Sequence, residues 1–237
     1  MNILLNDPMT YHEWKKTNED YKKRIESNKE KLEEFWDSYY VNTNTFSKDK
    51  IKMYDELIPN IIMNKISDFA STALWKYDHE ISTNNKQKYI YDNIVYEEIK
   101  KFSVDVYHNL YFHTLFHNII LPNIDIENKE NIMIDRMFMS GRLHGLSDFY
   151  HKDDRSDPKY GPSVYIFLNK TWKLYYDGSF SCILTDNDPT NTYHIENKHG
   201  RIVVFPPNIN HKFCEISGYG LLENAFCKVL EYHLIYV

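Results

Sequence analysis

The chain has 237 residues, of which 42% are hydrophobic and 16% aromatic, so it can bury a full core as one domain with a helical extension. Its net charge of −6 is the opposite of the basic surface that phosphate contacts require, so no nucleic-acid partner is expected. The three cysteines lack C-x-x-C spacing, which argues against a disulfide framework or a zinc knuckle and favours a reducing compartment.

The apolar run at the N-terminus is too short for a signal peptide, and no stretch approaches the roughly 20 apolar residues of a membrane span. We therefore expect a cytoplasmic, intracellular protein with no membrane partner. The abundance of Asn, Ile, Lys and Tyr is typical of an AT-rich coding genome, such as that of a virus. Oligomeric state has no readable signal in the sequence.

The glycines divide the chain into two regions. All seven lie between Gly141 and Gly220, so sharp turns are expected only in the second half, with helices first and strands second. We expect residues 1–125 to form a helical region that packs on a β core of residues 126–237, within one structural domain. Periodicity, a cap at Ser47 and an interruption at Pro59 predict three helices, over residues 12–40, 47–75 and 91–120.

From Ile132 the hydrophobic period shortens, and turn residues separate short apolar runs. Eight strands are predicted, at residues 132–140, 147–153, 163–169, 179–185, 192–196, 201–206, 211–216 and 225–237. Eight is the strand number of a jelly roll. The predicted fold class is therefore α+β, a jelly-roll or cupin-like barrel braced by N-terminal helices.

One pair of residues on this scaffold has the spacing of metal ligands. His151 and Asp153 are two apart, so in a strand their side chains leave the same face and can reach one ion. His211 follows a buried strand and a proline-stiffened turn and opens the next strand, a setting that no other histidine of the chain has. Two histidines and one carboxylate form the three-ligand face that leaves open positions on Fe(II).

In this order, the motifs resemble the Fe(II)/2-oxoglutarate-dependent dioxygenases, and within them the prolyl-4-hydroxylase-like branch. The resemblance covers about residues 132–237 and implies a double-stranded β-helix. It rests on His151-Lys-Asp153, Val164–Trp172, Tyr176-Asp177-Gly178, Gly200–Phe205, His211 and Lys228–Leu234.

The resemblance implies iron held by His151, Asp153 and His211, with 2-oxoglutarate as co-substrate, dioxygen as oxidant and ascorbate as a candidate reductant. The distal carboxylate of 2-oxoglutarate would pair with Lys228. The tyrosine that contacts the co-substrate in close relatives falls at Phe167 here, and Tyr165, two residues earlier on the same face, is expected to substitute for it. The implied reaction hydroxylates a C–H bond, with a peptidyl proline as the favoured substrate and release of succinate and CO2.

The expected position of Lys228 depends on strand alternation. If Lys228 points inward, Leu230, Tyr232 and Leu234 do so too, which places one ammonium on an apolar wall. In the family the cation often follows the distal histidine by about ten residues. The longer separation here is interpreted as a hairpin insertion at residues 218–224.

Three alternatives remain at this stage: a dioxygenase acting on a small molecule, one acting on nucleic acid, and a non-catalytic jelly roll that binds a partner or builds a shell. His194 and Glu196 also have ligand spacing, and His113 and His117 lie one helical turn apart. Without further ligands nearby, both pairs are interpreted as structural.

Overall fold

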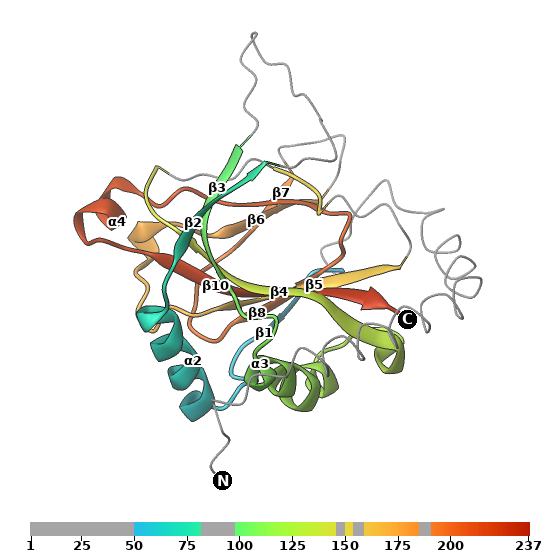
Figure 1. Cartoon of the computed structure of the whole chain (residues 1–237). Helices are drawn as coiled ribbons and strands as arrows, with labels where there is room; N and C mark the ends of the chain where they lie inside the picture. The colour runs from blue at the N-terminus through green and yellow to red at the C-terminus, as the bar shows by residue number, and fades with distance from the viewer. Residues whose placement is uncertain (1–49, 82–97, 146–149, 154–158, 185–190) are drawn as a thin grey trace.

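The computed structural model describes residues 50–81, 98–145, 150–153, 159–184 and 191–237 (Figure 1). Among these residues, no helix is both long and apolar enough to span a membrane. The described strands form two antiparallel sheets, one of seven strands and one of three.

The larger sheet has the strand order β1-β8-β5-β10-β4-β3-β2. Its central strand, β10, pairs on one side with β4 and on the other with β5. Strands from both halves of the chain therefore meet in one sheet. The members are β1 (Lys52–Tyr54), β2 (Lys76–Ile81), β3 (Glu98–Asp105), β4 (Ile132–Arg142), β5 (Tyr160–Phe167), β8 (Ile202–Phe205) and β10 (Cys227–Tyr236).

The smaller sheet has the order β7-β6-β9, formed by β7 (Thr192–Ile195), β6 (Phe180–Ile183) and β9 (Asn210–Phe213). An isolated antiparallel bridge between His151 and His211 extends it past β9. Every described strand pairing in both sheets is antiparallel.

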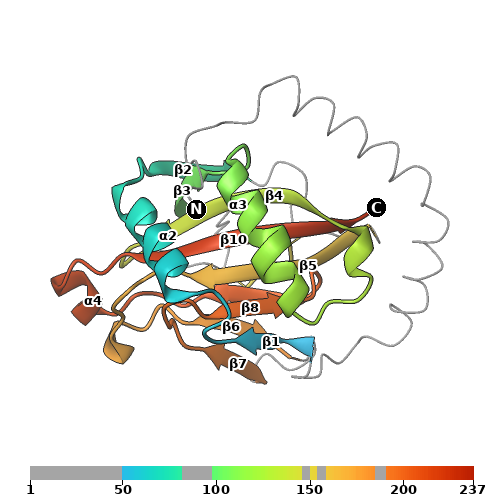
Figure 2. The ribbon, with the colours of Figure 1, turned by 90° about the horizontal axis from the view of Figure 1, so that it is seen from below.

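Helices cover one face of the larger sheet (Figure 2). Their buried side chains, such as Met63 and Phe112, pack against the sheet residues Leu230 and Tyr232 in one hydrophobic cluster. The helical elements are α2 (Asn60–Thr72), α3 (Leu110–Leu115), the π-helical turn η2 (Phe116–Ile120), the 3-10 turns η3 (Leu121–Asn123), η4 (Lys129–Asn131) and η5 (Leu174–Tyr176), and the short α4 (Gly218–Leu222).

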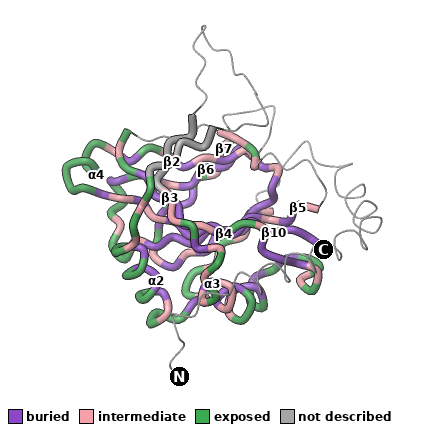
Figure 3. The backbone as a smooth tube through the Cα atoms, viewed as in Figure 1, coloured by how far each residue is buried: buried purple, intermediate pink, exposed green. Residues whose placement is uncertain are grey.

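The other face of the larger sheet packs against the smaller sheet and forms a second core. Side chains along β5 point alternately into the two hydrophobic cores. Val164 and Ile166 belong to the helix-side cluster, whereas Tyr165 and Phe167 belong to the cluster between the sheets. Both faces of β5 and β10 are therefore buried (Figure 3).

The strands predicted from residue 132 onward match β4 to β10 within a few residues, except that 147–153 is described only at residues 150–153, where His151 forms a bridge. The helix predictions hold less well. Residues 52–54 and 98–105 are strands of the larger sheet, so the predictions of helix there are wrong. The expected hairpin at 218–224 contains α4 instead. The helix over 12–40 lies outside the described residues.

Candidate metal centre

The main chain places His151 and His211 directly opposite each other. The amide of His151 donates to the carbonyl of His211 (3.0 Å), and the amide of His211 donates back to the carbonyl of His151 (2.9 Å). Residues paired in this way project their side chains to the same face. The two imidazole rings accordingly lie with their centroids 4.6 Å apart.

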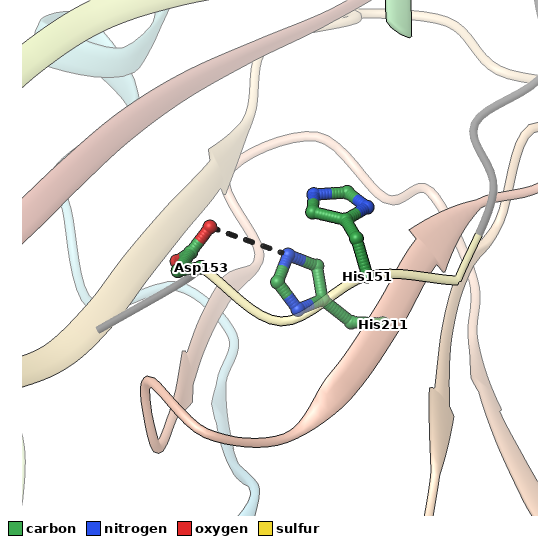
Figure 4. Close-up of side chains that lie close together, drawn as sticks. All are labelled: His151, Asp153 and His211. Carbon is green, nitrogen blue, oxygen red and sulfur yellow. Dashed lines mark ion pairs between the residues drawn. The ribbon is translucent and has the colours of Figure 1, made fainter. Parts of the chain in front are cut away.

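Asp153, two residues after His151, completes a three-residue cluster (Figure 4). One ligand atom from each of His151, Asp153 and His211 lies within 4.8 Å of the other two, and Nε2 of His211 is 3.8 Å from Oδ1 of Asp153. Among the described residues, this is the one group of three potential ligands that converges so closely. Its donor set is two imidazoles and a carboxylate, which suits a divalent transition metal.

His211 is held with one ring nitrogen ready to coordinate. Its Nδ1 lies 3.0 Å from the carbonyl oxygen of Ile209, which can only accept, so Nδ1 carries the proton and Nε2 keeps its lone pair. Nε2 is buried and makes no hydrogen bond to the described residues. Burial, with His151 nearby, lowers the pKa of His211 to about 4, so the ring is neutral at neutral pH. An unsatisfied, neutral nitrogen beside a carboxylate fits a bound metal ion.

A second layer of buried polar groups supports Asp153. The hydroxyl of Ser163 donates to its Oδ2 (2.8 Å), and Nδ1 of His233 lies 3.3 Å from the same oxygen. Nε2 of His233 lies 3.5 Å from Glu231, and Glu231 in turn accepts a hydrogen bond from Ser140. These contacts fix the orientation of the carboxylate, as outer-shell partners of metal ligands do.

Tyr165 lies on the face of β5 that points between the sheets. Its ring is edge-on to that of His211, with centroids 6.2 Å apart, and stacks on Phe213 at 5.9 Å. It is 3% exposed. Its role as a co-substrate contact remains a prediction.

Lys228 does not lie on that face. Its neighbours at alternate positions, Leu230 and Tyr232, belong to the helix-side cluster, and its ammonium donates to Ser71 of α2 (2.9 Å). Partial burial there lowers its pKa. The expectation that Lys228 points inward is therefore wrong, because the apolar residues that share its face pack against helices rather than against the smaller sheet.

The inward face of β10 instead carries Glu231 and His233, which sequence reasoning missed. On β4 the equivalent inward positions are Ser140 and Arg142, which pair with Val229 and Cys227 across the sheet. A signal was present in the sequence, since two polar residues alternate with Leu and Tyr in a strand expected to be buried. Polar groups in such a strand need hydrogen-bond partners inside the fold.

The other histidine pairs have no described third ligand. His113 contacts the carbonyl of Tyr107 (2.7 Å), and burial lowers the pKa of both His113 and His117. His194 contacts Thr192 on the surface of β7.

No family model matches the sequence, and no curated protein matches it. The structure, however, is similar to solved structures. A 2OG-Fe(II) oxygenase family oxidoreductase from Burkholderia pseudomallei superposes with a TM-score of 0.57 at 12% identity, covering 79% of this chain and 86% of that one. A Trichoplax adhaerens prolyl hydroxylase, solved with a hypoxia inducible factor peptide fragment, gives 0.55 at 12% identity, covering 94% and 93%.

A third structure, HygX from Streptomyces hygroscopicus with nickel, 2-oxoglutarate and hygromycin B bound, gives a TM-score of 0.55 at 8% identity. The match covers 84% of this chain and 86% of that one. At such low identity the likeness concerns the fold. This chain therefore has the fold of the 2OG-Fe(II) oxygenase superfamily, with prolyl hydroxylases among its structural neighbours.

Proposed function

We propose that the protein is an Fe(II)- and 2-oxoglutarate-dependent dioxygenase that hydroxylates a C–H bond of a peptidyl proline or a similar amino-acid residue. The observation that carries the proposal is the convergence of His151, Asp153 and His211, whose ligand atoms lie within 4.8 Å of one another. The fold shared with oxygenases supports it independently.

We infer that the two sheets are the halves of a double-stranded β-helix. In the larger sheet β8, β5, β10 and β4 are neighbours, and in the smaller sheet β7, β6 and β9 are followed by the bridge at His151. From β4 to β10, strands that follow one another in the chain fall alternately in the two sheets, apart from β6 and β7, which pair with each other in the smaller sheet; this order is that of a jelly roll. The cluster then lies inside the roll, on the smaller sheet.

Bound at this cluster, Fe(II) with 2-oxoglutarate and dioxygen would supply the oxidising chemistry, yielding hydroxylated product, succinate and CO2. The protein's own residues would bind and orient the substrate and the co-substrate, and would exclude water from the site. Phe205 and Phe180 stand beside the ring of His211, with centroids 4.8 and 5.5 Å away, and keep its surroundings apolar. Ser163 holds the orientation of Asp153. Such a reaction requires metal ligands in a fixed orientation and a site from which water is excluded.

The substrate class has two candidates. One structural neighbour holds a peptide fragment and another holds hygromycin B, at equal TM-scores. A peptidyl substrate is the first proposal, and a small molecule is the second.

The test is anaerobic addition of Fe(II) and 2-oxoglutarate to the full chain, followed by aerobic assays. We expect a weak visible metal-to-ligand absorption, and succinate release that rises with a subset of proline-containing peptides, free amino acids or aminoglycosides. Methylated oligonucleotides serve as the comparison for nucleic-acid substrates. Absence of both the absorption and succinate would refute the proposal and favour a non-catalytic jelly roll.

Ser163→Ala is expected to weaken metal binding by about 10- to 100-fold, because Asp153 loses a hydrogen bond that orients its carboxylate. Calorimetric titration with Mn(II) measures the change without oxidation. Ser71→Ala on α2 is the matched control and should bind Mn(II) as the parent does. Equal affinities for the Ser163 variant and the parent would show that this hydroxyl does not support a metal ligand.

A further inference from the structure

Arg142, the last residue of β4, is a buried cation on the face that points between the sheets. It is 5% exposed. In the register of β4 with β10 it lies directly opposite Cys227, the first residue of the last strand. Paired Cα atoms of antiparallel strands are about 5 Å apart, so a side chain at either position reaches the same space.

The guanidinium of Arg142 is placed relative to the candidate metal centre by strand β9. Its Cζ lies 3.9 Å from the centre of the Phe213 ring. Phe213, like His211, is buried between the sheets. It follows His211 by two residues, a spacing of about 7 Å along the strand. A five-carbon dicarboxylate bound at one end beside His211 has its other carboxylate at roughly that reach.

The chemistry of the guanidinium suits this ligand. It presents five N–H donors in a planar fork that matches a carboxylate. Its Nη1 donates to Ser140 (2.9 Å), and Ser140 donates to Glu231, so one arm is held in a fixed direction. The stacking on Phe213 holds the plane of the group. This anchoring fixes the plane of the guanidinium and the direction of one arm.

We propose that Arg142, rather than Lys228, binds the distal carboxylate of the 2-oxo dicarboxylate. The inference rests on the proposed function and moves the cation from the last strand to the strand beside it. Lys228 is turned to α2, where it contacts Ser71. Cys227, which stands opposite Arg142, carries no charge that could take the role.

A competing interpretation makes Arg142 only the counter-charge of the buried Glu231, with no ligand role. The two interpretations predict different effects of an Arg142 variant on ligand binding. A counter-charge affects stability whatever is bound, whereas a carboxylate receptor affects only ligands that have the distal carboxylate. The experiment therefore compares 2-oxoglutarate with 2-oxopentanoate, which has the same chain length and lacks that group.

The measurement is anaerobic titration of each 2-oxo acid into the Fe(II)-loaded full chain, followed by absorption and by thermal shift. We expect Arg142→Ala to raise the Kd for 2-oxoglutarate at least about tenfold, the equivalent of one charge-assisted hydrogen bond. Its Kd values for 2-oxopentanoate and for Mn(II) should equal those of the parent. Lys228→Ala, the matched control, should bind both acids as the parent does.

Moving the guanidinium to the opposite strand should restore the binding of 2-oxoglutarate. In the double variant R142A/C227R, the guanidinium enters from the opposite strand into the space that Arg142 vacates, and affinity for 2-oxoglutarate should return toward the parental value. Arg142→Lys should retain an intermediate affinity, because it keeps the charge and loses the fork.

The inference is overturned if Arg142→Ala binds 2-oxoglutarate as tightly as the parent, if Lys228→Ala loses it, or if Arg142→Ala loses both acids equally. In each of these cases the parent still shows the absorption. Loss of the absorption in the parent itself would instead refute the proposed function, and the assignment of Arg142 with it.

Discussion

Asp153→Ala is expected to abolish both divalent metal binding and 2-oxoglutarate turnover. The carboxylate is the one anionic member of the cluster, and its Oδ1 lies 3.8 Å from Nε2 of His211. Its removal leaves two imidazoles from the cluster to bind a 2+ ion. The metal affinity should therefore fall by more than the roughly 100-fold expected when an outer-shell partner is lost. Mn(II) calorimetry and succinate release measure the two effects.

The control for this variant is Asp68→Ala on α2, whose carboxylate is exposed and pairs with Lys170. It should keep full metal affinity and turnover. Unchanged succinate production by Asp153→Ala would contradict the assignment of the centre. Circular dichroism of both variants checks that they are folded, which separates a loss of binding from a loss of structure.

Tyr232→Ala is expected to cause the largest loss of stability among single changes in the described core. The side chain is fully buried, its hydroxyl donates to the carbonyl of Phe112 (3.1 Å), and its ring lies 4.9 Å from that of Phe116. Truncation of a buried aromatic residue costs about 3–5 kcal/mol. Because domains are stable by only about 5–15 kcal/mol, a large part of the free energy of unfolding is lost.

Urea denaturation measures the change in the free energy of unfolding, and two further variants serve as comparisons. Tyr232→Phe removes only the hydroxyl and should cost about 1–3 kcal/mol, since the carbonyl of Phe112 is left without this donor. Tyr219→Ala, at a 68% exposed tyrosine of α4, should stay within about 0.5 kcal/mol of the parent. Equal stability of Tyr232→Ala and Tyr219→Ala would contradict the packing of α3 on β10.

The strands of the second half were predictable because turn residues and a short hydrophobic period mark them locally. The prediction of helix at residues 98–105 failed for the opposite reason. That segment has no glycine or proline, and it becomes a strand through pairing with β2 and β4, which flank it in the sheet. Residues 52–54 likewise pair with β8, about 150 residues away.

The candidate centre was predictable in part. The spacing of His151 and Asp153, and the position of His211 after a proline turn, are local signals, and the structure brings all three together. The support of Asp153 by Ser163 and His233 was not predictable, since those residues come from β5 and β10 and meet only in the sheet.

The sequence by itself determined the strand-rich second half and the three residues that converge in the candidate centre, because both depend on short-range patterns. Only the tertiary structure decided which face of β10 points between the sheets. Both faces of that strand are buried, so the alternation of Leu230, Glu231, Tyr232 and His233 does not distinguish inside from outside. The packing of α2 and α3 on one face makes the distinction, and it turns Lys228 toward α2 and leaves Arg142 stacked on Phe213 between the sheets.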